Sequence, residues 1–404
     1  MGLFKSPHAK PVSKGRAIPA AALGILLLHA LPLGALPPAT PPKAPICPQV
    51  EVVFCVDTTG SMGGLISSAK AKVWSIINGI AGALNGPRLR VGLVAYRDRG
   101  DEYITQIFDL TDNLEAVQGR LSTFQANGGG DTPESVNQAL ADAVGKVSWS
   151  RDHVYRVVFL VGDAPPHMDY GDDVKYPLTC KTARGQGIVI NAIQCGNQAD
   201  TRDAWKTIAS LGGGGFAAIP QSGGARLIST PYDGWLAEFS SKLLATAVYT
   251  GPAEKREQTR QEQQRALAQS TQALKSKDPG SLALEADRGE FRGKAGRTSA
   301  GGLGLGREAG LSDLVENFLR QGASALDNLK AEELPEELRK LTPGERLERI
   351  RELSSERESL LRQIQDLSDM RDEQLEVEKK KDGEHAFDDE VLDLVRRQAS
   401  AHCE

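Results

Sequence analysis

Between residues 50 and 250, short apolar runs alternate with longer stretches in which apolar residues recur every three or four positions. The runs are rich in Val and Ile and are typical of buried strands, whereas the longer stretches are typical of helices. We expect strands at 50–56, 89–96, 103–110, 155–161, 188–194 and 215–219. We expect helices at 64–84, 113–124, 133–146, 177–185, 202–211 and 234–249. This alternation predicts an α/β fold, a doubly wound, mostly parallel sheet with helices on both faces.

Three polar loops are expected at the edge of this sheet where its parallel strands end. The first, residues 57–61, follows the first strand, and the third, residues 162–167, follows the strand that ends at Val161. The second, residues 128–135, is rich in Gly and leads into a helix, with Thr132 placed as the N-cap and Pro133 as the first helical residue. Ligands of doubly wound sheets bind at this edge. We therefore expect the functional site there.

The first loop carries side chains suited to a hard cation. Asp57, Thr59 and Ser61 stand at alternate positions, so their oxygens can converge on one point if the loop is extended. Oxygen ligands of this kind suit Mg²⁺, which needs few direct protein ligands because it keeps several of its waters. Taken alone, these residues could also cap the following helix.

The three loops together resemble a known family. Asp57-x-Thr59-x-Ser61, then Thr132 in a Gly-rich loop, then Asp163 at the end of a later strand, are similar to the metal-ion-dependent adhesion site of von Willebrand factor type A domains. The resemblance covers about residues 50–249. The second loop and the Tyr96-Arg97-Asp98 sequence are similar to bacterial and hemicentin-like members.

The resemblance implies a set of ligands and a function. The metal ligands would be Asp57, Thr59, Ser61, Thr132 and Asp163, holding Mg²⁺ or, in its place, Mn²⁺ or Ca²⁺. A Glu or Asp carboxylate of a protein partner would complete the coordination, and Thr132 would contact the metal directly only in the ligand-engaged state. The function implied is non-catalytic protein–protein interaction or adhesion.

Two other classes of function compete for the same residues. The Asp57 loop also resembles the phosphorylated loop of haloacid dehalogenase-like phosphatases, in which the first Asp is a nucleophile. Against this reading, Thr59 stands where that family usually has a second Asp, and no Lys is well placed in the loops for a phosphate. The other alternative is a structural cell-envelope protein with a vestigial site. We expect a protein that is not an enzyme.

The amino terminus predicts export. Residues 1–39 combine basic residues, an apolar run and small residues in the order of a secretory signal peptide, and an uncleaved membrane anchor is the alternative. Residues 40–47 form a Pro-rich tether. Both readings place the main domain, residues 48–250, in the periplasm, in the cell envelope or outside the cell.

Beyond residue 250 the composition becomes helical. All Trp and Tyr residues precede this point, so the dense core is expected before it. We expect a polar helix at 251–279, a Gly-rich flexible linker at 280–310 and a helical region at 311–404. Within the last region, 343–381 carries an apolar seam that predicts either coiled-coil self-association or a single helix packed on another part of the chain. A short helical hairpin is expected at 311–341.

Charge and cysteines exclude some classes. The net charge of −5 gives no reason to expect binding to nucleic acid or to anionic membranes. The five Cys are not spaced as a metal site, and Cys55 and Cys195 are expected inside strands. Export would allow a disulfide between Cys47 and Cys180, which the sequence alone does not establish.

Three weaker signals lie near the expected site. Asp98 is a candidate for the outer shell of the metal, although exposed loop Asp residues usually have no specific role. Residues 99–101 spell the integrin-recognised Arg-Gly-Asp tripeptide, which also recurs by chance. His167 follows Asp163 closely, but without a second His or Cys at a fitting spacing we expect a surface residue and not a zinc ligand.

Overall fold

The structure is a computed structural model that describes residues 49–83, 88–151, 154–219, 229–297, 311–327, 329–382 and 386–403. The predicted signal peptide or anchor and the Pro-rich tether lie outside the described residues. Within them, no helix combines the length and the apolar character that a membrane crossing requires. Residues 44–404 belong to one compact unit.

The sheet has six strands in the order β3-β2-β1-β4-β5-β6. The strands are β1 (Gln49–Asp57), β2 (Arg88–Tyr96), β3 (Thr105–Thr111), β4 (Tyr155–Gly162), β5 (Ile188–Cys195) and β6 (Gly213–Ile219). All neighbours are parallel except β2 and β3, which the short connection between them makes antiparallel. The predicted α/β fold class is confirmed. Because β1 is central, its carboxyl end opens where the winding of the sheet reverses.

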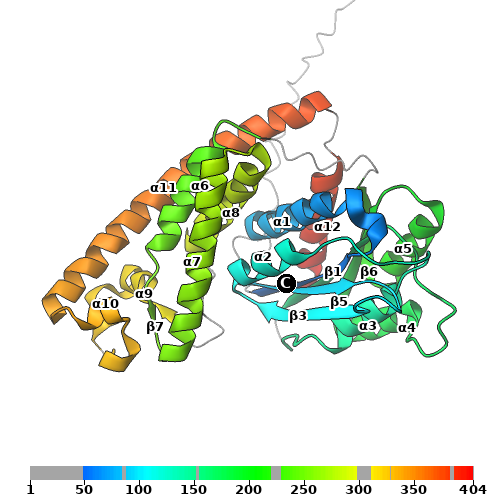
Figure 1. Cartoon of the computed structure of the whole chain (residues 1–404), viewed down its shortest axis with the longest axis horizontal. Coiled ribbons are helices and arrows are strands. Elements are labelled where there is room, and N and C mark those ends of the chain that lie inside the picture. Colours follow the sequence, from blue (N-terminus) through cyan, green and yellow to red (C-terminus); the bar gives the residue numbers. More distant parts are fainter. Residues whose placement is uncertain are drawn as a thin grey trace, which may run out of the picture. The chain divides into compact units, whose positions relative to one another are not determined.

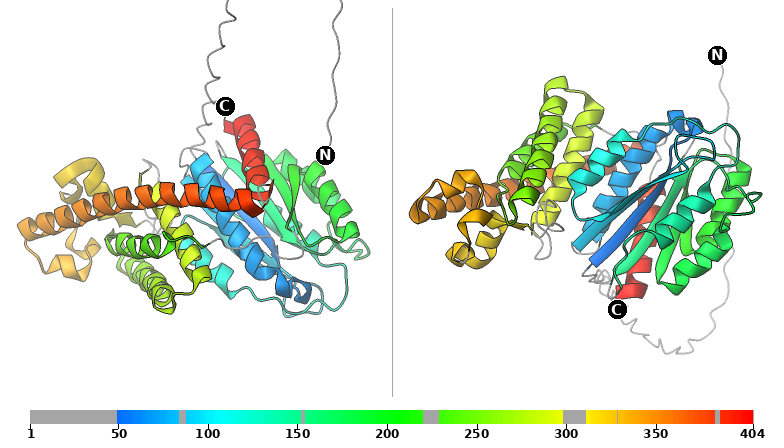
Figure 2. Two further views of the ribbon diagram at one scale, coloured as in Figure 1. Left: turned by 90° about the horizontal axis from the view of Figure 1, so that it is seen from above. Right: turned by 60° about the horizontal axis from the view of Figure 1, so that its bottom comes forward.

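Helices cover both faces of the sheet (Figure 2). Alternate residues of β1 point to opposite sides, so Val52, Phe54 and Val56 join one buried cluster, and Val53 and Cys55 join the other. The first cluster is completed by α1 (Ile66–Ala83), α2 (Leu114–Thr123) and α12 (Ala386–Cys403). The second is completed by α3 (Val136–Gly145), α4 (Tyr176–Gly185) and α5 (Ala199–Leu211).

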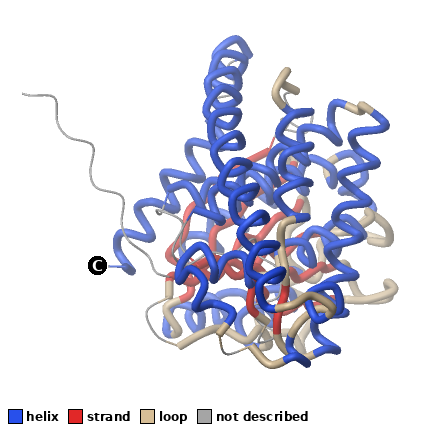
Figure 3. Tube along the Cα trace, turned by 90° about the vertical axis from the view of Figure 1, so that its left-hand side faces the viewer, coloured by secondary structure: helices blue, strands red, loops and turns tan. Residues whose placement is uncertain are grey.

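The remaining helices pack on one another beside the sheet domain. They are α6 (Asp233–Ala245), α7 (Ala253–Ser276), α8 (Pro279–Arg297), α9 (Leu314–Gln321), α10 (Glu336–Arg339) and α11 (Pro343–Asp382). Apolar residues of α6, α7, α8 and α11 share one buried cluster. Figure 3 shows how much of the described chain is helical, with the strands lying among the helices.

The predicted linker at 280–310 is wrong over its first part, because α8 is a helix that packs against α6. A Cβ added to Gly289 would come within 3.0 Å of the Leu236 carbonyl oxygen and the Ser240 Cβ. Gly289 therefore allows α8 and α6 to approach closely, which is a role in packing at this position. Residues 298–310 lie outside the described chain.

The apolar seam of α11 is used within the chain, which favours the second of the two predicted roles. Ile350 and Leu353 join one buried cluster, and Leu360 and Ile364 join another. Arg357, which interrupts the seam, is buried and pairs with Asp313 at 2.7 Å. A short two-stranded ladder of β7 (Tyr249–Thr250) and β8 (Ser312–Asp313) replaces part of the helical hairpin expected at 311–341.

The predicted helical region that follows the sheet domain is confirmed, and its last helix, α12, packs on one face of the sheet. Val391, Val395 and Ala399 are almost completely buried in the cluster on the α1 face of the sheet. Gln398 is buried and accepts a hydrogen bond from the Tyr155 hydroxyl at 2.6 Å. Figure 1 shows α12, in red, beside α1, and α12 also packs on β6 and β4 of the sheet.

Candidate metal centre

The strand β1 delivers Asp57 to the carboxyl edge of the sheet between two neighbours. Asp57 pairs in register with Tyr96, the last residue of β2, and β4 ends beside it at Gly162. Asp57 and Thr59 are fully buried, whereas Ser61 is exposed in the short 3₁₀-helix η1 (Gly60–Gly64) that precedes α1. The site therefore runs from a buried floor to an open rim.

A chain of hydrogen bonds joins the residues of the first and third loops. The Thr59 backbone N–H and its hydroxyl both donate to Asp57 Oδ1, at 2.9 and 2.7 Å. The hydroxyls of Thr59 and Ser61 lie 3.0 Å apart, and Ser61 donates to Asp163 Oδ1 at 2.8 Å. The structure thus brings together Asp57, Thr59, Ser61 and Asp163, as the sequence predicted. Ligation of a metal by these residues stays a prediction.

Several buried oxygens of the site lack a hydrogen-bond partner. They are Asp57 Oδ2, the Tyr96 hydroxyl and Glu134 Oε2. A Cβ added to Gly162 would come within 2.8 Å of Asp57 Oδ2 and 2.4 Å of the Tyr96 hydroxyl, so only Gly leaves this space open. A buried carboxylate oxygen without a donor is costly unless a cation or a proton neutralises it. The residues present therefore fit a bound cation.

The pKa values of the three acids at the site also indicate that a positive charge is missing there. Burial raises the pKa of Asp57 to about 7, and the nearby Asp163 adds to the shift. Burial also raises the pKa of Asp163, although the hydrogen bond from Ser61 opposes it. For Glu134, burial together with the charges of Asp57 and Asp98 raises the pKa to about 9. Each shift disfavours the charged carboxylate in the absence of a counter-charge.

The second loop differs from its prediction. Helix α3 begins at Val136, with Ser135 at the N-cap, so the assignments of Thr132 as N-cap and Pro133 as first helical residue are wrong. The reason is that the Glu134 N–H donates to the Pro165 carbonyl and the His167 N–H to the Glu134 carbonyl, which holds the loop extended against the third loop. Thr132 is exposed and takes no part in the hydrogen-bond chain described above.

Glu134 is a residue of the site that sequence reasoning missed. It is buried, and a Cβ added to Gly129 would lie 2.9 Å from Glu134 Oε1 and 3.0 Å from Thr59 Cβ. Glu134 therefore faces the floor of the site. In the sequence, only its position two residues after Thr132, in a loop expected at the site, pointed to Glu134. The burial of its carboxyl group depends on the folded chain.

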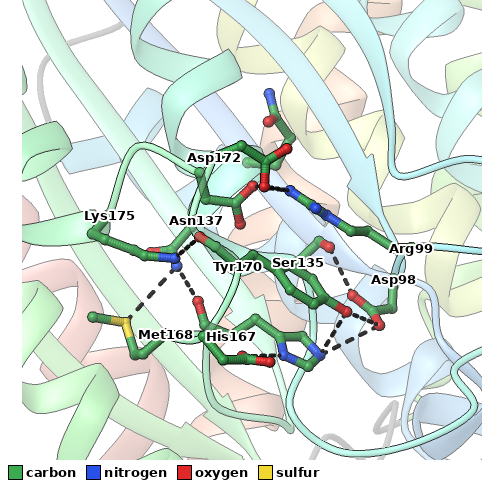
Figure 4. Close-up of polar contacts among 12 residues, drawn as sticks. Asp98, Arg99, Ser135, Asn137, His167, Met168, Tyr170, Asp172 and Lys175 are labelled. Carbon is green, nitrogen blue, oxygen red and sulfur yellow. Dashed lines mark hydrogen bonds and ion pairs between the residues drawn. The ribbon is translucent and has the colours of Figure 1, made fainter.

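A second polar cluster surrounds His167 (Figure 4). His167 is buried, so its expected surface position is wrong. Asp98 is buried too and accepts hydrogen bonds from Ser135 Oγ at 2.7 Å and the Tyr170 hydroxyl at 2.9 Å.

The two charged residues of the Arg-Gly-Asp tripeptide are bonded within the chain. Arg99 pairs with Asp172 and Asp173. Asp101 accepts hydrogen bonds from the backbone N–H groups of Asp98 and Gly129.

The buried thiols Cys55, Cys180 and Cys195 are free and sit in the core. Burial raises the pKa of Cys180 to about 11 and those of the two strand thiols further, which makes all three poor nucleophiles. Cys47, the partner considered for Cys180, lies outside the described residues.

Residues 51–215 match the family model described as the von Willebrand factor A domain. Over this stretch the chain is similar to von Willebrand factor A domains, and residues 51–215 are called the A domain below. It contains all three loops of the site and ends at β6, and it leaves most of the helical region unmatched.

A curated protein also resembles part of the chain. A putative ariadne-like RING finger protein, R811, from Acanthamoeba polyphaga mimivirus is 29% identical over 118 residues, which are 29% of this chain and 11% of that protein. The chain thus matches only a small part of that relative.

Solved structures resemble less than half of this chain. Proximal thread matrix protein 1 from the mussel byssus is 20% identical with a TM-score of 0.35 and covers 44% of each chain. A structure of the same protein with a zinc-occupied MIDAS motif has a TM-score of 0.34 at 20% identity and covers 43% of this chain and 42% of that one. The SpRpn10 VWA domain is 14% identical with a TM-score of 0.34 and covers 43% of this chain and 89% of that one.

Proposed function

We propose that the A domain holds a divalent cation at the end of β1 and uses it to bind a protein partner without catalysis. The observation that carries the proposal is the chain of polar contacts from Asp57 Oδ1 through Thr59 and Ser61 to Asp163, which leaves the other Asp57 oxygen, Oδ2, buried and without a partner. Carboxylates and hydroxyls converge there, and their charge is not balanced within the site.

The donor set is made of oxygen atoms alone, which suits Mg²⁺ first and Mn²⁺ or Ca²⁺ as alternatives. Ser61 and Asp163 lie toward the rim and Asp57 forms the floor, with Glu134 beside Thr59. When bound, the cation would supply a coordination position for a Glu or Asp carboxylate of the partner. Thr132, exposed on the loop that carries Glu134, remains a candidate contact in the partner-bound state only.

The geometry argues against the phosphatase alternative. Asp57 is fully buried, and its Oδ1 already accepts two hydrogen bonds from Thr59. A nucleophile must approach its substrate, which the burial of Asp57 opposes, and Thr59 stands where that family usually has a second Asp. We therefore propose a binding module. Export and an adhesive role in the cell envelope are part of the same proposal and rest on the amino-terminal sequence.

The proposal is tested by titrating the full chain with Mg²⁺ and with Mn²⁺ in a calorimeter. Asp57→Asn keeps the size of the side chain and removes its charge, so we expect it to abolish measurable binding. Asp172→Asn is the matched control, because Asp172 is exposed and pairs with Arg99 away from the site. Unchanged metal affinity in Asp57→Asn would refute the site.

The binding role is tested separately by a pull-down with the wild-type chain in Mg²⁺ or in a chelator, and with Asp57→Asn in Mg²⁺. We expect a partner to be retained only by the wild type in Mg²⁺. A chain that binds metal but recovers the same proteins in all three conditions would favour the structural alternative.

A further inference from the structure

A second group of metal-ligating atoms lies beside the first site and shares none of the residues proposed to hold the first cation. Oxygen atoms of Asp98 and Asp131 and a ring nitrogen of His167 lie within 4.8 Å of one another. Asp98 and His167 are buried, and Asp131 is exposed at the mouth. The three come from the loop after β2, from the Gly-rich loop and from the loop after β4.

Hydrogen bonding fixes how the imidazole is presented. His167 Nδ1 lies 2.8 Å from Asp169 Oδ1, a carboxylate that can only accept, so Nδ1 carries the proton. In the neutral ring this leaves the lone pair on Nε2, which faces Asp98 Oδ2 at 3.4 Å. A carboxylate that orients a His from its far nitrogen is the usual support of a metal-binding imidazole.

The cluster has more acceptors than donors. The Tyr170 hydroxyl lies 2.9 Å from Asp98 Oδ2 and 3.1 Å from His167 Nε2, but it has one proton and can satisfy only one of them. Ser135 donates to the other Asp98 oxygen, at 2.7 Å. If the imidazole is neutral, one of the two facing lone pairs is left without a donor, and the carboxylate of Asp131 adds more acceptors. A cation would satisfy all of them at once.

The spacing also matches a coordinated ion. The 3.4 Å between Asp98 Oδ2 and His167 Nε2 is longer than a good hydrogen bond. Two ligands bound at about 2.1 Å to a tetrahedral Zn²⁺ ion stand about 3.4 Å apart. Asp131 is exposed, and one of its oxygens already lies within 4.8 Å of the other two ligand atoms.

We propose that Asp98, Asp131 and His167 form a second cation site for a borderline transition ion of the Zn²⁺ class. Imidazole with two carboxylates suits such an ion, whereas the oxygen-only set at Asp57 suits Mg²⁺. Three protein ligands leave a coordination position open to solvent or to a ligand. The two sites are linked by the backbone, because the His167 N–H donates to the Glu134 carbonyl and the Glu134 N–H to the Pro165 carbonyl.

The test uses the full chain in the Asp57→Asn background, which removes the first site. Zn²⁺ is titrated in competition with a chromophoric chelator, and Co²⁺ is added as a spectroscopic probe. We expect Asp57→Asn to bind one Zn²⁺ and to give Co²⁺ visible bands typical of nitrogen ligation. Adding His167→Gln should abolish both signals. Asp169→Asn should weaken Zn²⁺ binding roughly 10- to 100-fold, because it releases the orientation of the ring.

Two further variants make the result decisive. Asp131→Asn should lower Zn²⁺ affinity without disturbing folding, because Asp131 is exposed, and it replaces His167→Gln if that variant does not fold. Asp172→Asn, an exposed neighbour on the same surface, should leave Zn²⁺ binding unchanged.

The proposal is overturned if the folded Asp57→Asn/His167→Gln variant binds Zn²⁺ as tightly as Asp57→Asn does. It is equally overturned if Asp57→Asn alone removes all Zn²⁺ binding, and His167 would then be only the ion-pair partner of Asp98. Neither outcome bears on Mg²⁺ binding at Asp57, so failure of this proposal is distinct from failure of the proposed function.

Discussion

At the scale of single residues, the first site contains buried acidic side chains that destabilise a protein unless their charge is balanced. Asp57 is fully buried at the centre of the sheet edge, where its Oδ1 is bonded and its Oδ2 is not. Asp163 and Glu134 add two more acids whose pKa values are raised. Such a set costs stability unless a cation balances it, and residues of this kind are found where a protein binds something.

The raised pKa of Asp57 predicts that Mg²⁺ affinity depends on pH. Because this pKa is about 7, the carboxyl is largely protonated below neutrality, and Mg²⁺ must displace the proton. We expect affinity to rise with pH between about 6 and 8, by up to tenfold per unit for one displaced proton. Calorimetry in buffers of different ionisation enthalpy measures the protons released. Constant affinity over this range, with no proton release, would contradict the shift.

The space beside Asp57 gives a second residue-scale prediction. Gly162→Ala would push a methyl group toward Asp57 Oδ2 and the Tyr96 hydroxyl. We expect weaker Mg²⁺ binding and a loss of about 1–3 kcal/mol in the free energy of unfolding, as for other overpacked sites. Gly171→Ala is the control, because a Cβ there meets nothing within 4 Å. Calorimetry measures Mg²⁺ affinity and chemical denaturation measures the free energy of unfolding. Equal values for Gly162→Ala and Gly171→Ala would show that Mg²⁺ binding does not need the space beside Asp57.

At the scale of elements, one buried arginine fastens three helices of the C-terminal region. Arg371 of α11 pairs with Asp233 of α6 at 2.8 Å, and with Asp287 and Glu290 of α8 at 2.7 and 2.8 Å. Its side chain is only 4% exposed. Charged groups at this depth require their partners, so the network fixes how α11 lies on the other two helices.

Arg371→Met should therefore be strongly destabilising. It leaves three carboxylates of α6 and α8 without their shared counter-charge, and breaking a buried ion pair in this way typically costs about 3–5 kcal/mol. Arg362→Met, on the exposed side of the same helix, should change the free energy of unfolding by less than about 0.5 kcal/mol. Chemical denaturation measures the free energy of unfolding of the two variants. A similarly small loss in both would show that the Arg371 network does not stabilise the packing of the three helices.

At the scale of the whole molecule, the chain returns to the A domain at its end. Helix α12 places Val391, Val395 and Ala399 in the cluster that covers one face of the sheet. Gln398 exchanges hydrogen bonds with Asn191 at 3.1 and 2.8 Å and accepts one from Tyr155. Residues 48–250 therefore lack part of the core of the domain that they were expected to form.

This arrangement predicts that the A domain depends on the C-terminus. Gln398→Ala removes hydrogen bonds from two buried groups and should cost about 1–3 kcal/mol. A chain truncated after residue 385 should lose more, because it also exposes the apolar surface under α12. Arg396→Ala, exposed on the outer side of α12, is the control. Thermal unfolding of the three chains tests this, and an unchanged midpoint in the truncated chain would show that α12 is dispensable.

The sequence by itself determined the strands of the sheet and most of the first site. The periodicity of apolar residues predicted each strand of the sheet, and the spacing of Asp57, Thr59, Ser61 and Asp163 predicted groups that the structure joins by hydrogen bonds. These patterns are local, because neighbouring residues determine whether a segment forms a strand or a loop. Parallel strands also bring their carboxyl ends to one edge of the sheet.

Only the tertiary structure decided the features that join distant segments. Glu134 enters the first site, and Asp98 meets Asp131 and His167, because backbone hydrogen bonds hold the second and third loops together. Helix α8 packs closely on α6 at Gly289, and α12 completes a core that begins hundreds of residues earlier. Burial and proximity arise from contacts between segments, so no pattern within one segment encodes them.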